Sequence, residues 1–123
     1  MSEIKYVDTY IDMTDQDLAR ELVGKKIVKI NTEYNTITLH DGTVLKFHDT
    51  SECCAWFQAE LEEKNLTDNA ITRVTTSGQY DDESWTIHIL AADKNIADVH
   101  IRGDEGTGYY CQSIELEILK TGE

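Results

Sequence analysis

A possible metal site is the first chemical feature of the sequence. His88 and His100 lie in successive strand-like segments near the end of the chain, and Cys111 follows in a third. A register that pairs Ile89 with Val99 places His88 opposite His100, and the next strand brings Cys111 beside them. Imidazole and thiolate are transition-metal ligands. The spacing matches no common zinc motif, so ordinary polar neighbours on a solvated sheet face remain the alternative.

A thiol site is the second candidate. Cys53 and Cys54 are adjacent, and His48 lies a few residues earlier. A thiol in the first turn of a helix has a lowered pKa, which is typical of nucleophiles and redox sensors. The alternative is one buried cysteine that packs as a small hydrophobe beside a half-exposed neighbour. No oriented base accompanies the pair, so the sequence does not favour an enzyme.

Acidic loops with an exposed aromatic residue form the third candidate, a surface for a protein partner. The residues that we expect to make this surface are Asp81, Asp82, Glu83, Asp104, Glu105 and Tyr109. The loop 103–108 is rich in glycine but carries no lysine and precedes a strand, so it does not have the pattern of a phosphate-binding loop. Its acids also lack the alternating oxygen series of a calcium loop.

The charge balance supports a basic partner rather than nucleic acid or a membrane. The 123 residues include 24 acidic and 11 basic side chains, giving a net charge of −13. Such a charge repels phosphate backbones and anionic lipids, although solubility alone also explains it. No apolar run approaches the ~20 residues of a membrane span. Three cysteines do not suggest a secreted disulfide framework, so we expect reduced thiols and a cytoplasmic location.

A hairpin at Asp41-Gly42 sets the register of the first strands. A three-residue loop that ends with Gly42 in the left-handed region places Ile37 and Leu39 on the same face as Leu45 and Phe47. This register gathers four large apolar side chains on one side and needs a positive φ only at glycine. We therefore prefer it to a two-residue loop.

A helix is expected directly after this hairpin. Its N-cap candidates are Asp49, Thr50 and Ser51, and it ends before a polar loop at 65–69. Cys54, Phe57 and Leu61 recur with helical spacing and form its buried stripe. Glu60, Glu62 and Glu63 would then lie at the end of the helix where the dipole disfavours negative charge.

The rest of the chain predicts a single α+β domain, 1–123. A short helix at 15–23 is capped by Thr14 and ended by Gly24. We expect an antiparallel meander of about six to seven strands packed on the main helix. Besides a possible arm at 1–12 and a tail at 120–123, the expected strands are 26–30, 36–40, 43–48, 71–76, 84–91, 96–102 and 109–119.

Two groups of motifs resemble a small uncharacterised domain family that occurs in bacteriophages, notably those of actinobacteria, and in some bacteria. The first group is Leu22-Val23-Gly24-Lys25, the stretch 41–47 and Glu52-Cys53-Cys54. The second is Ser84-Trp85-Thr86, the stretch 99–102 and Gly108-Tyr109-Tyr110. The resemblance covers about 22–115. It implies a small phage-encoded accessory protein that acts in the cytoplasm of a bacterial host, and it implies no activity.

Together these observations predict a non-enzymatic protein, without a cofactor, that binds an unknown protein partner. The partner is expected to be basic or itself a nucleic-acid-binding protein, and the sharp form of the hypothesis is a DNA mimic or host-factor inhibitor. The alternative is a small-molecule or metal binder that uses the face of His88, His100 and Cys111.

Overall fold

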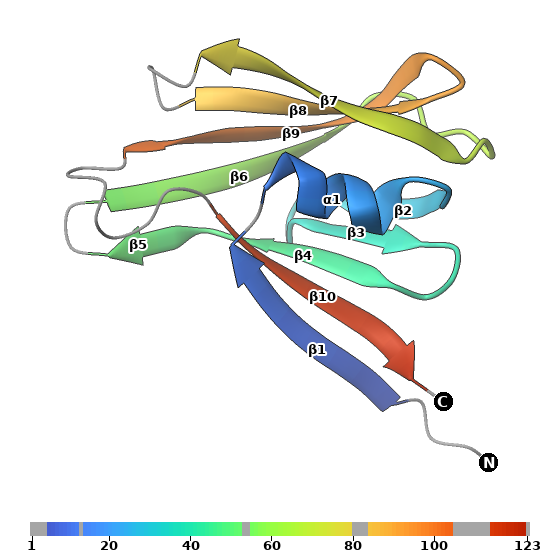
Figure 1. The fold of residues 1–123 in the computed structure, drawn as a ribbon, viewed down its shortest axis with the longest axis horizontal. Helices are drawn as coiled ribbons and strands as arrows, with labels where there is room; N and C mark the ends of the chain where they lie inside the picture. The colour runs from blue at the N-terminus through green and yellow to red at the C-terminus, as the bar shows by residue number, and fades with distance from the viewer. Residues whose placement is uncertain (1–4, 13, 53–54, 80–83, 105–113, 123) are drawn as a thin grey trace.

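Two five-stranded antiparallel sheets form the body of the protein in a computed structural model (Figure 1). The structure describes residues 5–12, 14–52, 55–79, 84–104 and 114–122. Sheet A has the strand order β1 (Lys5–Asp12), β10 (Glu115–Gly122), β4 (Val44–His48), β3 (Thr36–Leu39) and β2 (Ile27–Asn31). Sheet B has the order β5 (Thr50–Glu52), β6 (Ala55–Glu63), β9 (Lys94–Asp104), β8 (Ser84–Ala91) and β7 (Ile71–Gln79).

The hydrophobic core combines residues from both sheets and from the helix α1 (Asp15–Leu22). In Figure 1 this helix lies between the strands of sheet A and those of sheet B. Alternate residues of the strands face the core because successive side chains of a strand point to opposite faces. The largest fully buried side chains are Phe57, Leu18, Leu22, Ile37, Leu39, Leu45, Ile71, Ile87, Ile89, Ile96, Ile101 and Ile114.

The short helix confirms its predicted caps. The Thr14 hydroxyl oxygen accepts a hydrogen bond from the backbone N–H of Asp17 at 3.1 Å. Leu18 and Leu22 are fully buried, as their spacing predicts. Gly24 follows the C-cap with φ +87°, a conformation that favours glycine. Within the described residues, no helix has both the length and the apolar character needed to cross a bilayer.

The Asp41-Gly42 hairpin is also confirmed. Ile37 pairs with Leu45, and Gly42 has φ +92° at the end of the loop. The apolar face is buried on both strands, since Leu39 and Phe47 are as inaccessible as the first pair. The choice of the three-residue loop was therefore correct, because it satisfies burial and backbone conformation together.

The predicted main helix is wrong. The segment instead forms β5 and β6, and β6 pairs antiparallel with β9. Phe57, Ala59 and Leu61 are buried in alternation with exposed residues, which is the two-residue period of a strand. Asp49, a predicted helix cap, instead accepts a hydrogen bond from the N–H of Ala59 at 3.1 Å. Long-range pairing overrides the helix propensity of this segment.

Strand order and strand ends differ from the prediction as well. The chain is not one meander, because β10 lies between β1 and β4, and β9 lies between β6 and β8. The predicted arm at 1–12 contains the strand β1, and the predicted tail at 120–123 continues β10 to Gly122. The strands β1 and β10 pair along eight residues each, so the described residues of both predicted segments belong to sheet A. The early part of the predicted strand 109–119 lies outside the described residues.

Candidate functional site

A polar surface covers the side of sheet B that faces away from the core. We call it the histidine face. It comes from four neighbouring strands and the turns that join them, because the residues that alternate with the buried ones point outward. Its members are Glu62 and Lys64 at the end of β6, Ser77 on β7, Thr86 and His88 on β8, and Asn95, Asp98 and His100 on β9.

The register of β8 and β9 corrects the predicted metal site. His88 pairs with Asp98, and His100 pairs with Thr86, so the two histidines are not opposite one another. The hairpin turns through Ala92 and Asp93, both with positive φ, and a register shift follows near Leu90. Our alignment assumed a different turn and no shift, and it was wrong by two residues.

The third predicted ligand does not join this site through β9. Both edges of β9 are already paired, since Ile101 lies between Ala59 of β6 and Trp85 of β8. The edge of β9 that we expected to pair with the last strand is therefore occupied by β6. Cys111 itself falls outside the described residues.

A chain of three hydrogen-bonded side chains crosses the histidine face. Ser77 Oγ lies 2.6 Å from His88 Nε2, and His88 Nδ1 lies 2.8 Å from Asp98 Oδ1. An ionised carboxylate only accepts hydrogen bonds, so Nδ1 carries the proton and Nε2 accepts from the serine hydroxyl. Asn95 Nδ2 donates to the same Asp98 oxygen at 2.8 Å. The order of groups is that of a nucleophile, a base and an orienting acid.

The position of Ser77 argues against that chemistry. Acyl transfer needs N–H groups that converge on the developing oxyanion. Ser77 lies inside β7, which is regular over Val74–Gln79. Successive N–H groups of a strand point to opposite edges, so the chain beside Ser77 does not place two donors on one point. The arrangement instead fixes Asp98, whose side chain is only 5% exposed.

The pKa of Asp98 reflects this surrounding. Burial acts to raise the pKa of the Asp98 carboxyl, but the hydrogen bonds from His88 and Asn95 outweigh it and hold the pKa below its ordinary value. Lys64 Nζ lies 3.7 Å from the other carboxylate oxygen, Oδ2, and adds to the lowering. Asp98 is therefore a buried anion at neutral pH, held by donors on one oxygen and facing a cation with the other.

A second row of hydrogen-bonded side chains joins Thr86, His100, Glu62 and Lys64 on the same face. His100 Nε2 lies 2.7 Å from Glu62 Oε1, and His100 Nδ1 lies 3.0 Å from Thr86 Oγ1. Lys64 Nζ is 3.1 Å from Glu62 Oε2. The hydrogen bond with His100, followed by that with Lys64, lowers the pKa of Glu62, and the pKa of Lys64 is raised chiefly by Glu62.

The two rows meet at one point of the surface. One ligand atom each from Glu62, Asp98 and His100 lies within 4.8 Å of the others. Glu62 pairs with Asp98 across β6 and β9, and His100 is two residues further on the same face of β9. Ser77, Glu62 and Asp98 were missed from the sequence, because only the true register brings them to the histidines.

The other predicted site residues fall in different places. Tyr109, Glu105 and the acidic run 81–83 lie outside the described residues, and so do Cys53 and Cys54. Asp104 is the last residue of β9, where it pairs with Trp56 of β6. His48 points elsewhere: its Nε2 lies 2.6 Å from Oε1 of Glu117, an outward-facing acid that is nevertheless largely buried.

Trp56 is an exposed aromatic residue at the end of sheet B where β9 finishes. Its accessibility is 40%, whereas the second tryptophan, Trp85, is 9% exposed and packs against Phe57 with ring centroids 5.9 Å apart. The strand β6 turns Trp56 outward, and its backbone pairs with that of Asp104.

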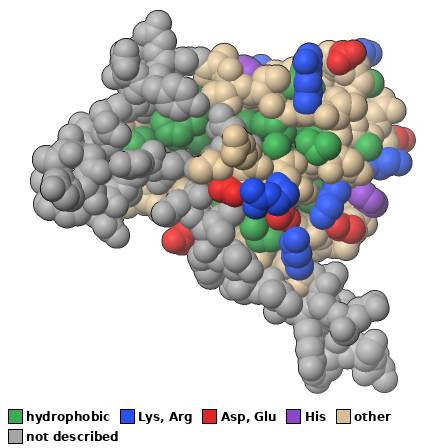
Figure 2. Space-filling view, viewed as in Figure 1, with side chains coloured by type: hydrophobic (Ala, Val, Ile, Leu, Met, Phe, Trp, Pro, Cys, Tyr) green, Lys and Arg blue, Asp and Glu red, His purple; other side chains and the backbone are tan. Residues whose placement is uncertain are grey.

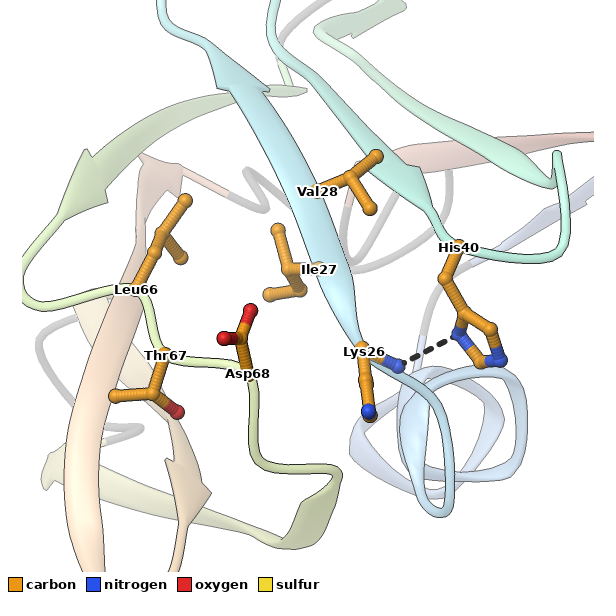
Figure 3. Close-up of a pocket in the computed structure, with 7 residues that line it drawn as sticks. All are labelled: Lys26, Ile27, Val28, His40, Leu66, Thr67 and Asp68. Carbon is orange, nitrogen blue, oxygen red and sulfur yellow. Dashed lines mark hydrogen bonds between the residues drawn. The ribbon is translucent and has the colours of Figure 1, made fainter.

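A shallow groove of about 400 Å³ lies along β2 on sheet A (Figure 3). Ile27, Val28 and Leu66 line it, and the backbone N–H of Lys26 donates to His40 Nδ1 at 3.0 Å beside it. On the face shown in Figure 2, Lys and Arg side chains lie among Asp and Glu. The described part of that face is therefore mixed in charge.

Comparisons with known proteins give one match. A family described as "Domain of unknown function (DUF7448)" matches residues 20–116. Neither the curated proteins nor the solved structures contain a significant match. The match covers the last three residues of α1, the strands β2 to β9 and the first two residues of β10, so it includes the whole histidine face, whereas β1 lies outside it.

Proposed function

Since the chain belongs to this family of domains of unknown function, we propose that it acts by binding a basic protein, without catalysis. The net charge of −13 supports a cationic partner, because unlike fields accelerate and select association. The sharp form of the proposal is a small phage-encoded protein that occupies the nucleic-acid-binding surface of a host factor in the bacterial cytoplasm.

The observation that carries the proposal is the exposure of Trp56 at one end of sheet B. Tryptophan is enriched among residues that dominate binding energies, and here it stands opposite Asp104 at the end of β9. In the sequence, Glu105 directly follows β9 and the acidic run 81–83 directly precedes β8. An exposed tryptophan on a protein of net charge −13 suits a partner that presents lysine or arginine around an apolar pocket.

A pull-down with a defined competitor tests this function. Immobilised protein is incubated with bacterial lysate at low salt, and bound proteins are eluted with duplex DNA, with high salt or with buffer. We expect a basic nucleic-acid-binding protein that DNA and salt release, since both compete for the same charges. Release by salt but not by DNA would contradict the DNA-mimic form, and the absence of any basic protein at low salt would contradict the proposal itself.

Two variants locate the surface. Trp56→Ala is expected to lose the captured protein, because hot-spot truncations cost about 2 kcal/mol or more, a factor of roughly 30 in affinity. Tyr34→Ala is the matched control, since Tyr34 is an aromatic residue that is 62% exposed on the β2–β3 turn of sheet A. Equal loss in both variants, or in neither, would place the contact elsewhere.

A further inference from the structure

Glu62, Asp98 and His100 bring together three groups that can bind a metal ion, a property that the proposed partner binding does not use. Two carboxylates and one imidazole are a common ligand set for zinc and neighbouring divalent metals. Metal–ligand bonds of about 2.0–2.2 Å allow ligand atoms up to roughly 4.4 Å apart. The three groups already lie within 4.8 Å of one another, so only small side-chain movements separate this arrangement from coordination.

The supporting hydrogen bonds are those of a metal site. Asp98 uses Oδ1 to accept from His88 and Asn95, which leaves Oδ2 turned toward Lys64 at 3.7 Å. Within the described part of the chain, the Lys64 ammonium group is the polar group that faces Oδ2. Partners that orient a ligand from behind while its other atom faces the site form the outer shell of metal centres.

His100 has the same support. Thr86 Oγ1 lies 3.0 Å from His100 Nδ1, and a hydroxyl either donates or accepts. Nδ1 therefore carries the proton when Nε2 gives its lone pair to a metal, and Nε2 carries it when it faces Glu62 alone. The ring switches between these forms without losing its hydrogen bond to Thr86.

A buried atom without a partner lies close to Asp98. Asn95 Oδ1 is inaccessible to solvent and, within the described part of the chain, accepts no hydrogen bond. Its own Nδ2 is bonded to Asp98 at 2.8 Å, so Oδ1 lies one amide group from the ligand carboxylate. Buried acceptors are rarely left unsatisfied. A water molecule bound beside Asp98 would supply the missing donor.

We propose that Glu62, Asp98 and His100 bind a divalent transition-metal ion of the zinc class, which displaces Lys64 from between the two carboxylates. Lys64 Nζ lies 3.1 Å from Glu62 Oε2 and stands where a cation is electrostatically required. Lys64 directly follows β6, and its side chain is 40% exposed. The side chain can therefore move into solvent without disturbing the hydrophobic core. His88 is an orienting residue in this site and contacts no metal.

The test is a calorimetric titration of ZnCl₂ into the chelator-treated full chain, with CoCl₂ absorption as a second readout. We expect one equivalent of Zn²⁺ to bind, and Co²⁺ to give weak visible bands without a thiolate charge-transfer band. His100→Gln and Glu62→Gln should each weaken Zn²⁺ binding at least about tenfold. Both side chains are more than 40% exposed, so these variants keep the fold.

Matched variants make the outcome decisive. His40→Gln and Glu63→Gln change an exposed histidine and an exposed acid outside the cluster, and they should bind Zn²⁺ like the wild type. Lys64→Met should bind at least about fivefold more tightly, because the competing positive charge is gone. No uptake by the wild type, unchanged uptake by His100→Gln, or a thiolate band with Co²⁺ would overturn the proposal. None of these results depends on Trp56 or on a protein partner.

Discussion

The imidazole of His88 and the carboxylate of Asp98 pair across β8 and β9, with Nδ1 and Oδ1 2.8 Å apart. This contact lies on the outward side of sheet B, yet Asp98 is almost as inaccessible as the core. The carboxylate is thus a structural centre of the histidine face, and its removal has measurable consequences.

Asp98→Asn should destabilise the fold by about 1–3 kcal/mol. The variant replaces the carboxylate, which accepts hydrogen bonds from His88 and Asn95, by an uncharged amide that is a weaker acceptor. The donors of His88 and Asn95 are then less well satisfied. Urea denaturation measures the loss. Asp93→Asn is the control: Asp93 is exposed, and asparagine tolerates its φ of 62°, so we expect a change within about 0.5 kcal/mol. Equal effects in the two variants would contradict this role of Asp98.

The contribution of Asp98 should disappear in acid. Its pKa is lower in the folded protein than in the unfolded chain, so the unfolded state takes up the proton first as the pH falls. The stabilisation is complete above the unfolded value of about 3.9 and is lost as the pH falls through the folded pKa. We expect the stability difference between wild type and Asp98→Asn to be constant from pH 7 to 5 and to shrink below about pH 4. A difference that grows in acid would show that the pKa is raised instead.

Gly103→Ala should be more damaging than Gly24→Ala. A Cβ on Gly103 would lie 2.1 Å from the carbonyl oxygen of Trp56 and 2.5 Å from Cδ1 of Phe57, so β6 and β9 must separate. Overpacking of this kind costs about 1–3 kcal/mol or more. Gly24 has open space around it, and there the cost is the left-handed backbone alone, about 1–2 kcal/mol. Thermal unfolding gives the order, and a smaller effect at Gly103 would contradict the close approach.

Ser77 should not react as a catalytic nucleophile. It is hydrogen-bonded to His88, but its strand does not provide converging donors for an oxyanion. Incubation with a fluorophosphonate probe, read by intact mass, should give no more labelling of wild type than of Ser77→Ala. Stoichiometric labelling that is lost in Ser77→Ala and in His88→Gln would establish a hydrolase-type site and refute the binding proposal in its non-catalytic form.

Local signals predicted the helix α1 and the β3–β4 hairpin correctly. Thr14, Gly24 and Gly42 each specify a backbone conformation, and the apolar spacing around them agrees with it. Where a cap, a glycine and burial give the same answer, the sequence alone is sufficient.

The segment that became β6 gave conflicting signals. The spacing of Phe57 and Leu61 fits a helix, while the alternation with Ala59 fits a strand equally well. The acids Glu60, Glu62 and Glu63 were unfavourable at the end of a helix. On a strand, Glu62 pairs with Asp98 and its carboxylate forms a hydrogen bond with His100.

The histidine face depended on information that a single sequence hardly contains. His88 and His100 were identified, but their neighbours follow from a two-residue turn at Ala92-Asp93 and a register shift near Leu90. Alanine at positive φ is not a turn signal. A slip of two residues keeps the same side chains outward and exchanges every partner.

The ribbon of β1 and β10 (Figure 1) determines how the protein would respond to mechanical force. Lys5 lies opposite Gly122, at one end of the ladder that runs to Asp12 and Glu115. A pull on these two ends would load the cross-strand bonds one pair at a time, because they are perpendicular to antiparallel strands. The ribbon would therefore unzip at low tension.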